Sequence, residues 1–151
     1  QIDDCVQGSV YDLPFGEDEF DHAISINVFN HLQHPKEAIK ELARVTTQES
    51  TLLFNYMNLC SWYWPAAMYV NLNGKAIGQP VYSSWEKPSA VQSWAEHSHL
   101  QLIRCAGNVH IPRVLDRTPL VKVMKILDRI SRVGTYQALA PCQFCLYKKT
   151  S

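Results

Sequence analysis

The chain has no excess of charge of either sign, because its 14 Lys and Arg residues balance 14 Asp and Glu residues. A neutral chain offers no electrostatic footprint for nucleic acid or an anionic membrane, so we expect no nucleic acid partner. No apolar run approaches the ~20 residues that cross a bilayer, and we expect no membrane span. The five cysteines are odd in number and lack the spacing of a disulfide framework. That pattern favours reduced thiols and a cytoplasmic location.

What the chain does have is enough apolar sequence for one packed domain. It contains 151 residues, of which 46% are hydrophobic and 19% charged. These proportions are typical of globular proteins and exclude a disordered chain. We see no internal repeat and no low-complexity segment.

The first half of the chain predicts a strand, a helix and a second strand. A nearly continuous apolar run, formed by Ala23, Ile24, Ile26 and Val28, predicts a strand over 21–26 that is covered on both faces. Pro35 suits the first position of a helix, and apolar residues then recur at helical spacing for about three turns. The run "TQES" should end this helix, and Thr51 to Tyr56 should form the next strand. A strand, helix and strand over so short a length predict a parallel βαβ unit.

The flanking segments predict further elements. Residues 5–10 suit the end of a short strand that stops at Gly8. Downstream, the sequence predicts a short helix over 65–70, a helix from Pro88, a strand over 99–105, a helix over 118–133 and a closing strand over 142–149.

The stretch "GSVYDLPFGEDEFDHAISINVFNHLQHPKEAIKELARV" resembles the middle of class I S-adenosylmethionine-dependent methyltransferases of type 11. The residues that match the family pattern are Gly8, Leu13, Pro14, Phe15, Phe20, Asp21, His31, Leu32, Pro35, Glu41, Arg44 and Val45. The resemblance implies an α/β, Rossmann-like fold with sheet order three, two, one, four, five, seven, six. It also implies S-adenosyl-L-methionine as cofactor.

The resemblance assigns cofactor contacts to two groups of residues. A first group, beside the adenine, is Gly8, Ser9 and Val10. A second group, beside the methionine part, is Ser25, Ile26, Asn27 and His31. The carboxyl ends of parallel strands line the ligand crevice of such folds, which supports the second group. For each residue the alternative is an ordinary strand end or turn, and His31 alone has three readings: a general base, a cofactor neighbour or a structural histidine.

Three features depart from the family pattern. Ser9 stands where the family has an Asp, and 47–50 replace a "KPGG" turn. The Gly-rich cofactor loop and the acidic residue for the ribose are missing, and Gly74 and Gly78 lie too far downstream to replace that loop. We therefore expect the C-terminal part of a larger methyltransferase domain, without strands one and two. Its open sheet edge should take the upstream half or a second copy.

Within this partial domain, residues 1–57 should form the cofactor side, and 58–98 and 112–140 the acceptor side. The segment 58–85 is rich in Trp and Tyr and holds a single charged residue, Lys75. Half of its aromatic residues could be core, and the others could line a site for a small apolar acceptor. We assign acceptor contacts to Asn58, Tyr82 and Trp85.

No residue stands out as a catalytic base, and no metal site is expected. Cys142 and Cys145 lack a second ligand pair, so core packing is the better reading of this C-x-x-C. Two other functions remain open: a non-catalytic, methyltransferase-like subunit that binds a partner, and a nicotinamide-dependent Rossmann enzyme. The residues of the matched stretch argue against the latter.

Overall fold

A computed structural model describes residues 5–62, 84–108, 120–131 and 138–150. In chain order the strands and helices are β1 (Phe20–Ser25), the 3-10 helix η1 (Phe29–His31), α1 (Pro35–Val45), β2 (Thr46–Asn58), β3 (Trp85–Glu86), α3 (Pro88–His97), β4 (Leu100–Asn108), α4 (Leu120–Ser131) and β5 (Cys142–Lys149).

The sheet has the order β1-β2-β5-β4, with the short β3 paired to the end of β2. The pairs β1–β2 and β2–β3 are parallel, while β5 runs antiparallel to both β2 and β4. The βαβ unit predicted from the sequence is therefore confirmed. The strand order matches four, five, seven, six of the Rossmann-like methyltransferase fold, and that fold class is confirmed as well.

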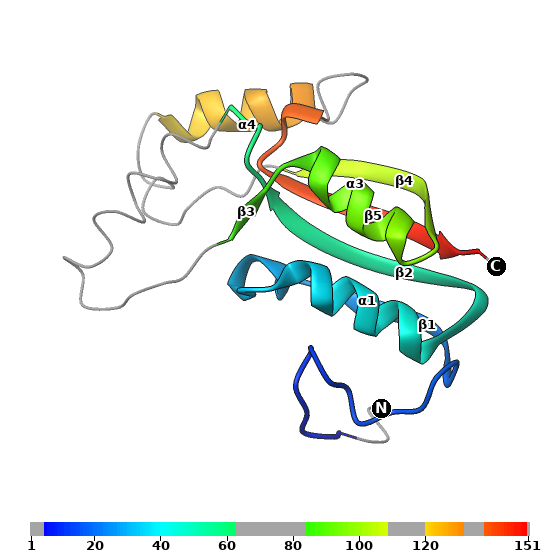
Figure 1. Cartoon of the computed structure of the whole chain (residues 1–151). Coiled ribbons are helices and arrows are strands. Elements are labelled where there is room, and N and C mark those ends of the chain that lie inside the picture. The colour runs from blue at the N-terminus through cyan, green and yellow to red at the C-terminus, as the bar shows by residue number, and fades with distance from the viewer. Residues whose placement is uncertain (1–4, 63–83, 109–119, 132–137, 151) are drawn as a thin grey trace.

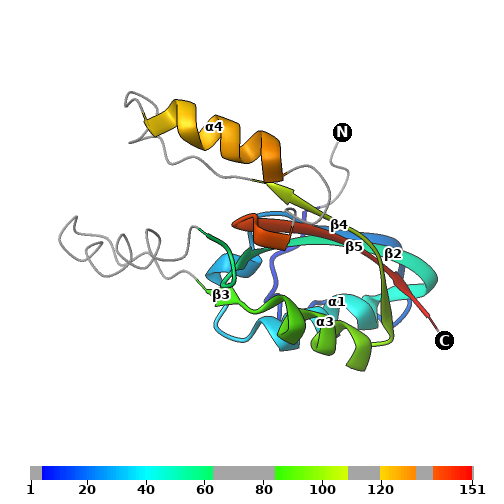
Figure 2. The same cartoon turned by 90° about the horizontal axis from the view of Figure 1, so that it is seen from above.

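Helices α1 and α3 cover one face of this sheet, whereas α4 lies on the opposite side (Figure 2). Helix α1 begins at Pro35, whose ring fixes a helical φ and needs no hydrogen-bond donor there. Its apolar stripe, which includes Ala38 and Ile39, is buried against β2. Helix α3 begins in the same way at Pro88 and buries Val91 and Ala95.

The core beneath these helices is organised around Phe54 of β2, which is fully buried. Its ring stacks on Phe29 of η1 on one side, with centroids 4.7 Å apart, and on Tyr147 of β5 on the other, at 5.1 Å. Such aromatic pairs add about 0.5–1.5 kcal/mol beyond the apolar area they bury. The stack thus ties the segment after β1 to the last strand.

The loop before β1 is fastened to α1 by a salt bridge that also binds backbone. Glu41 Oε1 accepts a hydrogen bond from Leu13 N at 2.9 Å and from Arg44 Nη2 at 2.7 Å. Arg44 Nη2 donates further to the carbonyls of Leu13 and Phe15. The Arg44 hydrogen bond lowers the pKa of Glu41, although partial burial opposes this shift. Leu13, Pro14 and Phe15 are thereby held on the helix.

A second charged contact joins the last strand to the loop before β1. Lys149 of β5 is nearly buried, and its Nζ donates to Asp18 Oδ1 at 2.8 Å and to the Thr46 carbonyl at 2.6 Å. A buried ammonium needs such partners, because desolvation would otherwise be costly. The start of β2 and the loop before β1 are therefore tied to the C-terminal strand.

Two sequence-based expectations about strands are wrong. Residues 5–8 form no strand, and Ser9 makes only an isolated bridge to Asp12 within a turn, because no described strand lies beside them. Helix α1 does end before the run "TQES", but the strand predicted to begin at Thr51 already begins at Thr46. The run shifts the register with β1, and Glu49 adopts a positive φ of 64°.

The expectation of reduced cysteines is wrong for one pair, because Cys105 and Cys145 form a disulfide. They are directly opposite each other in β4 and β5, with Cα atoms 4.2 Å apart, although 40 residues separate them in sequence. Cys5, Cys60 and Cys142 are unpaired thiols. The prediction that Cys142 and Cys145 pack in the core is confirmed, because both side chains are buried.

The helix predicted over 65–70 lies outside the described residues, as do the ends of the helix predicted over 118–133. Among the described helices, none is long and apolar enough to cross a membrane.

We predict that Glu41→Gln lowers the free energy of unfolding at pH 7 by about 1.5–3 kcal/mol, the range for hydrogen bonds to a charged group. The folded-state pKa of Glu41 lies below its ordinary value of 4.5, so its stabilising effect is full above that pH. This effect is lost as the pH falls through the folded-state pKa. Urea unfolding at pH 7 and at pH 3 should therefore show the gap between variant and parent closing in acid.

Glu37→Gln is the matched control, because Glu37 is exposed on the same helix. It should change stability little at either pH. A Glu41→Gln gap that is the same at both pH values would contradict the assigned role of the carboxylate.

Candidate functional site

The candidate site lies where β1 and β2 end, because parallel strands present their carboxyl ends to the same crevice. The strand β1 stops at Ser25, which is buried, and the next three residues are exposed. Two of these are apolar: Ile26 is 41% and Val28 37% exposed. Exposed aliphatic side chains at this edge leave an apolar surface for a ligand.

Asn27 lies between them in a left-handed conformation with φ of 58°. Asn adopts this region more readily than other residues with a Cβ atom. Its backbone N donates to Asn55 Oδ1 at 2.6 Å, and Asn55 Nδ2 returns a hydrogen bond to Asn27 Oδ1 at 3.1 Å. Asn55 Nδ2 also donates to Cys142 Sγ at 3.2 Å. A buried amide of β2 thus fixes the turn that follows β1.

The other predicted cofactor residues form a compact turn upstream of β1. The Ser9 carbonyl accepts from Asp12 N at 3.1 Å, and Ser9 Oγ accepts from Tyr11 N at 3.2 Å. Gly8 packs tightly on Pro14, since a Cβ atom added to Gly8 would lie 2.6 Å from Pro14 Cδ. Glycine is required at that position by this close approach.

Tyr11 joins this turn to the residues that follow β1. Its hydroxyl oxygen accepts hydrogen bonds from Gln33 N at 3.1 Å and His34 N at 3.3 Å. Its ring also makes an edge contact with the His34 ring, at 6.0 Å between centroids. The two predicted groups of cofactor residues are therefore connected through the start of α1.

His31 is exposed at the end of η1. Its Nε2 lies 2.9 Å from Asn30 Nδ2, and its backbone N donates to the Val28 carbonyl. The Asn30 carbonyl in turn accepts from Ser84 N at 2.7 Å. This short helix therefore links the end of β1 to the segment that enters β3.

The predicted acceptor residues have different surroundings. Asn58 is fully buried, and its Nδ2 donates to the carbonyls of Ala138 and Ala140 while its Oδ1 accepts from Cys60 N. Its amide thus shapes the turn after β2. Trp85 is half-buried beside the end of β2, and none of the described residues accepts a hydrogen bond from its buried Nε1. Tyr82 lies outside the described residues.

Three ionisable side chains of β2 and β5 have raised pKa values because they are buried. Desolvation raises the pKa of the Cys142 thiol, against the hydrogen bond from Asn55. Burial also raises the pKa of Tyr56, and it raises the pKa of Tyr147 to about 12. At neutral pH these groups stay protonated, so none of them is a ready base. Within the described part of the chain, no cluster of His, Cys, Asp and Glu could hold a metal ion.

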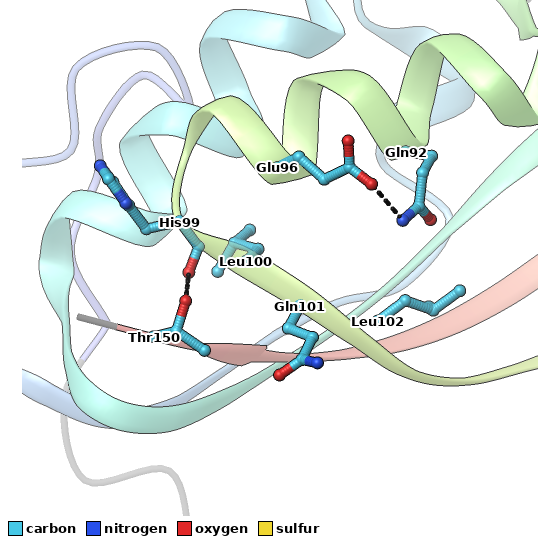
Figure 3. A pocket seen from close by; sticks show the side chains of 7 residues that line it. All are labelled: Gln92, Glu96, His99, Leu100, Gln101, Leu102 and Thr150. Atoms are coloured by element: carbon cyan, nitrogen blue, oxygen red, sulfur yellow. Dashed lines mark hydrogen bonds between the residues drawn. The ribbon is translucent and has the colours of Figure 1, made fainter.

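Two cavities lie at the other end of the sheet, around His99. The larger, of about 510 Å³, is lined by Gln92, Glu96, His99, Leu100, Gln101, Leu102 and Thr150 (Figure 3). The smaller, of about 300 Å³, is lined by Lys40, Ala43, Arg44, His97, Ser98, His99 and Lys149. Leu100 pairs with Lys149 at this end, whereas Asn108 pairs with Cys142 near the end of β2. The cavities are therefore remote from the crevice that the strand order defines.

Comparison with solved structures identifies the class of fold. The chain is similar to a S-adenosylmethionine-dependent methyltransferase of Thermotoga maritima, described as a possible histamine N-methyltransferase, with TM-score 0.67 and 11% identity over 96% of this chain and 63% of that one. It is also similar to the YcgJ protein of Bacillus subtilis, with TM-score 0.60, 20% identity and coverage of 97% and 70%. A third similar structure is a S-adenosylmethionine-dependent methyltransferase of Archaeoglobus fulgidus. Its TM-score is 0.61 and its identity 11%, over 95% of this chain and 66% of that one.

The chain thus has the Rossmann-like fold of class I methyltransferases. Residues 1–54 match a family model described as a methyltransferase domain. The matched residues include the Gly8 turn, all of α1 and the strand β2 as far as Phe54. Comparison with curated protein sequences gives no match. The chain spans 63% of the length of the Thermotoga maritima structure.

Sequence analysis missed two residues that organise the site, Asn55 and Tyr11. Asn55 interrupts an apolar strand with a buried amide, and that interruption was an available signal. Tyr11 gave no such signal in the sequence, because the residues that donate hydrogen bonds to its hydroxyl lie 22 and 23 positions downstream. The structure brings Ser25, Ile26 and Asn27 together at one edge. It places the Gly8 turn beside α1, where Tyr11 connects it to that edge.

We predict that Gly8→Ala destabilises the fold by about 1–3 kcal/mol, the usual cost of overpacking. The added methyl would meet the rigid Pro14 ring, so the turn must shift. Gly16→Ala is the control, because there the nearest atom is Glu19 Oε2, at the end of a flexible side chain, 3.4 Å away. Thermal unfolding of both variants, with amide chemical shifts of Val10 and Tyr11, measures the effect. Equal destabilisation in the two variants would refute the steric argument.

Proposed function

We propose that this chain is part of a longer enzyme that uses S-adenosyl-L-methionine to methylate a small, apolar molecule. The observation that carries the proposal is the exposed, rigidly held turn at Asn27, at the carboxyl end of β1 in a methyltransferase fold. The family match over residues 1–54 supports it.

The residues at this edge fit such a cofactor. Ile26 and Val28 offer an apolar surface, while the exposed Asn27 amide can donate from Nδ2 to a carboxylate. In the upstream turn, Ser9 Oγ already accepts one hydrogen bond, and a hydroxyl oxygen has a second lone pair for the adenine amino group. Gly8 and Val10 would complete that side, and Ser25 and His31 would border the methionine part.

When bound, the cofactor supplies an electrophilic methyl group on a sulfonium. The task of the protein is then to align an acceptor atom with that methyl group, and positioning of this kind can supply about 7–11 kcal/mol. Rigid hydrogen bonds from Asn55 to Asn27 suit such a role. A base is needed only for weakly acidic acceptors, and we assign none.

The apolar character of the acceptor follows from the segment after β2. In the sequence, residues 58–85 include one charged residue, Lys75. Trp62, a described residue of this segment, is 37% exposed. A site so lined would disfavour a highly charged acceptor, because unpaired charge is costly to desolvate. We keep Trp85 and Tyr82 as proposed acceptor contacts. Asn58 would act through the shape of its turn.

The proposal includes a partner at the free edge of β1, which is an outer strand of the described sheet. Ile24 of this strand is 70% exposed, and it faces the same side as Leu53. We propose that strands of the remaining methyltransferase domain pair there and supply the glycine-rich loop. A second copy of this chain would be the alternative occupant, and a purely partner-binding, non-catalytic subunit the alternative function. A cytoplasmic location is also proposed; the three unpaired thiols favour it, whereas the disulfide between Cys105 and Cys145 does not.

We expect the 151-residue chain alone to give no measurable binding of S-adenosylmethionine by calorimetry, because it lacks the glycine-rich loop. The longer protein that contains that loop should bind. In it, Asn27→Gly should weaken binding about tenfold, since glycine keeps the positive φ but removes the amide.

Glu49→Gly is the matched control, because Glu49 also has a positive φ but lies before the first core residues of β2. It should leave the dissociation constant unchanged. Equal weakening by both substitutions, or tight binding by the chain alone, would contradict the placement of the site. Absence of binding by the longer protein would favour the non-catalytic alternative.

We predict that the longer protein transfers methyl groups to small apolar acceptors and not to RNA or to basic protein tails. A screen with radiolabelled cofactor across these three classes would measure this. Replacement of Trp85 by Ala should raise KM for the acceptor and leave the dissociation constant of the cofactor unchanged. Activity confined to RNA would overturn the apolar assignment.

A further inference from the structure

Helix α4 carries an apolar stripe that the rest of the described structure leaves uncovered. Val123 is 56% and Ile126 60% exposed, and residues three apart lie on the same side of a helix. Among the described elements, α4 contacts β4 of the sheet. Figure 1 shows α4 near the carboxyl end of β2, and Figure 2 shows it on the side of the sheet opposite to α1 and α3.

A basic stripe runs beside this apolar stripe. Lys122, Lys125 and Arg129 are all exposed, and their spacing places them along one side of the helix. Asp128 is the one acidic residue of α4. None of the ion pairs in the described part of the chain uses a cation of α4. The helix therefore has a local excess of positive charge in a chain that is neutral as a whole.

We propose that α4 is a docking surface for an anionic lipid membrane. Basic amphipathic helices lie in the plane of the membrane, with the apolar stripe among the acyl chains and the cations near the headgroups. With 12 residues, α4 is too short to cross a bilayer, which fits a surface position. Charge complementarity selects the anionic surface, because each cation near it strengthens binding about fivefold.

The position of α4 gives this docking a consequence for the site. The helix lies on the side to which the carboxyl ends of β1 and β2 point (Figure 1). Trp62 and Leu139, joined by a backbone hydrogen bond, are also exposed apolar residues next to the end of β2. A membrane held by α4 would present apolar molecules near this end of the sheet. That consequence rests on the proposed function, whereas the docking itself does not.

The test uses the 151-residue chain without cofactor, so that it is independent of methyl transfer. Sedimentation with phosphatidylcholine vesicles that contain a minor fraction of phosphatidylserine should bring down the chain, and vesicles of phosphatidylcholine alone should bring down much less. Removing the cations with Lys122→Gln, Lys125→Gln and Arg129→Gln together should weaken binding about a hundredfold. The control variant combines Lys36→Gln, Lys40→Gln and Lys87→Gln, which remove three exposed cations outside α4.

A second pair of variants tests the apolar stripe. Val123→Ala with Ile126→Ala should weaken binding at least about tenfold, from the methylene groups removed. Alanine is the best helix former, so a loss cannot be ascribed to melting of α4. Val6→Ala with Ile103→Ala is the control, because these residues are 56% and 53% exposed outside α4.

Circular dichroism should show unchanged helix content in all variants. Failure of the parent chain to sediment with anionic vesicles would overturn the proposal. So would equal binding to neutral vesicles, or losses of the same size in the control variants. Binding of α4 to an acidic protein, with no binding to vesicles, would overturn it in favour of a protein partner.

Discussion

The packing of Phe54 is the constraint on which the rest of this structure depends. Its ring lies between Phe29, which follows β1, and Tyr147 of β5. The next residue, Asn55, lies on the opposite face of the sheet because side chains alternate along a strand. There it holds Asn27 by two hydrogen bonds. Two consecutive residues of β2 thus set the core on one face and the geometry of the candidate site on the other.

The upstream turn depends on a different device, because no strand of the described sheet supports it. Glu41 and Arg44 bind the backbone of Leu13 and Phe15, and Tyr11 receives the amides of Gln33 and His34. Each of these side chains works on backbone groups that would otherwise need solvent. Helix α1 therefore serves as the platform for both groups of predicted cofactor residues. This explains why the family match includes α1 although none of its residues is expected to touch a cofactor.

The sequence predicts those elements whose residues repeat with a clear period. Helix α1 follows from Pro35 and its apolar spacing, and β1 from a continuous apolar run. The start of β2 could not be found in this way, because 46–50 are polar. Thr46 pairs with Phe20 of β1, and its carbonyl accepts a hydrogen bond from Lys149. The disulfide between Cys105 and Cys145 escaped for a similar reason, since only the order of β4 and β5 brings them together. The resemblance supplied that order, but pairwise register is a property of the folded chain.

Although the net charge is zero, the chain has two basic surfaces. They differ in whether their cations have acidic partners within the described structure. Around the smaller cavity, Arg44 and Lys149 are held by Glu41 and Asp18. These two charges have intramolecular partners, so they do not call for an anionic ligand in that cavity. The cations of α4 extend along the whole helix, beyond the last turn that a dipole would favour, and they border exposed Val123 and Ile126. Segregation of charge beside uncovered apolar surface, more than the amount of charge, is what distinguishes a surface built to meet a partner.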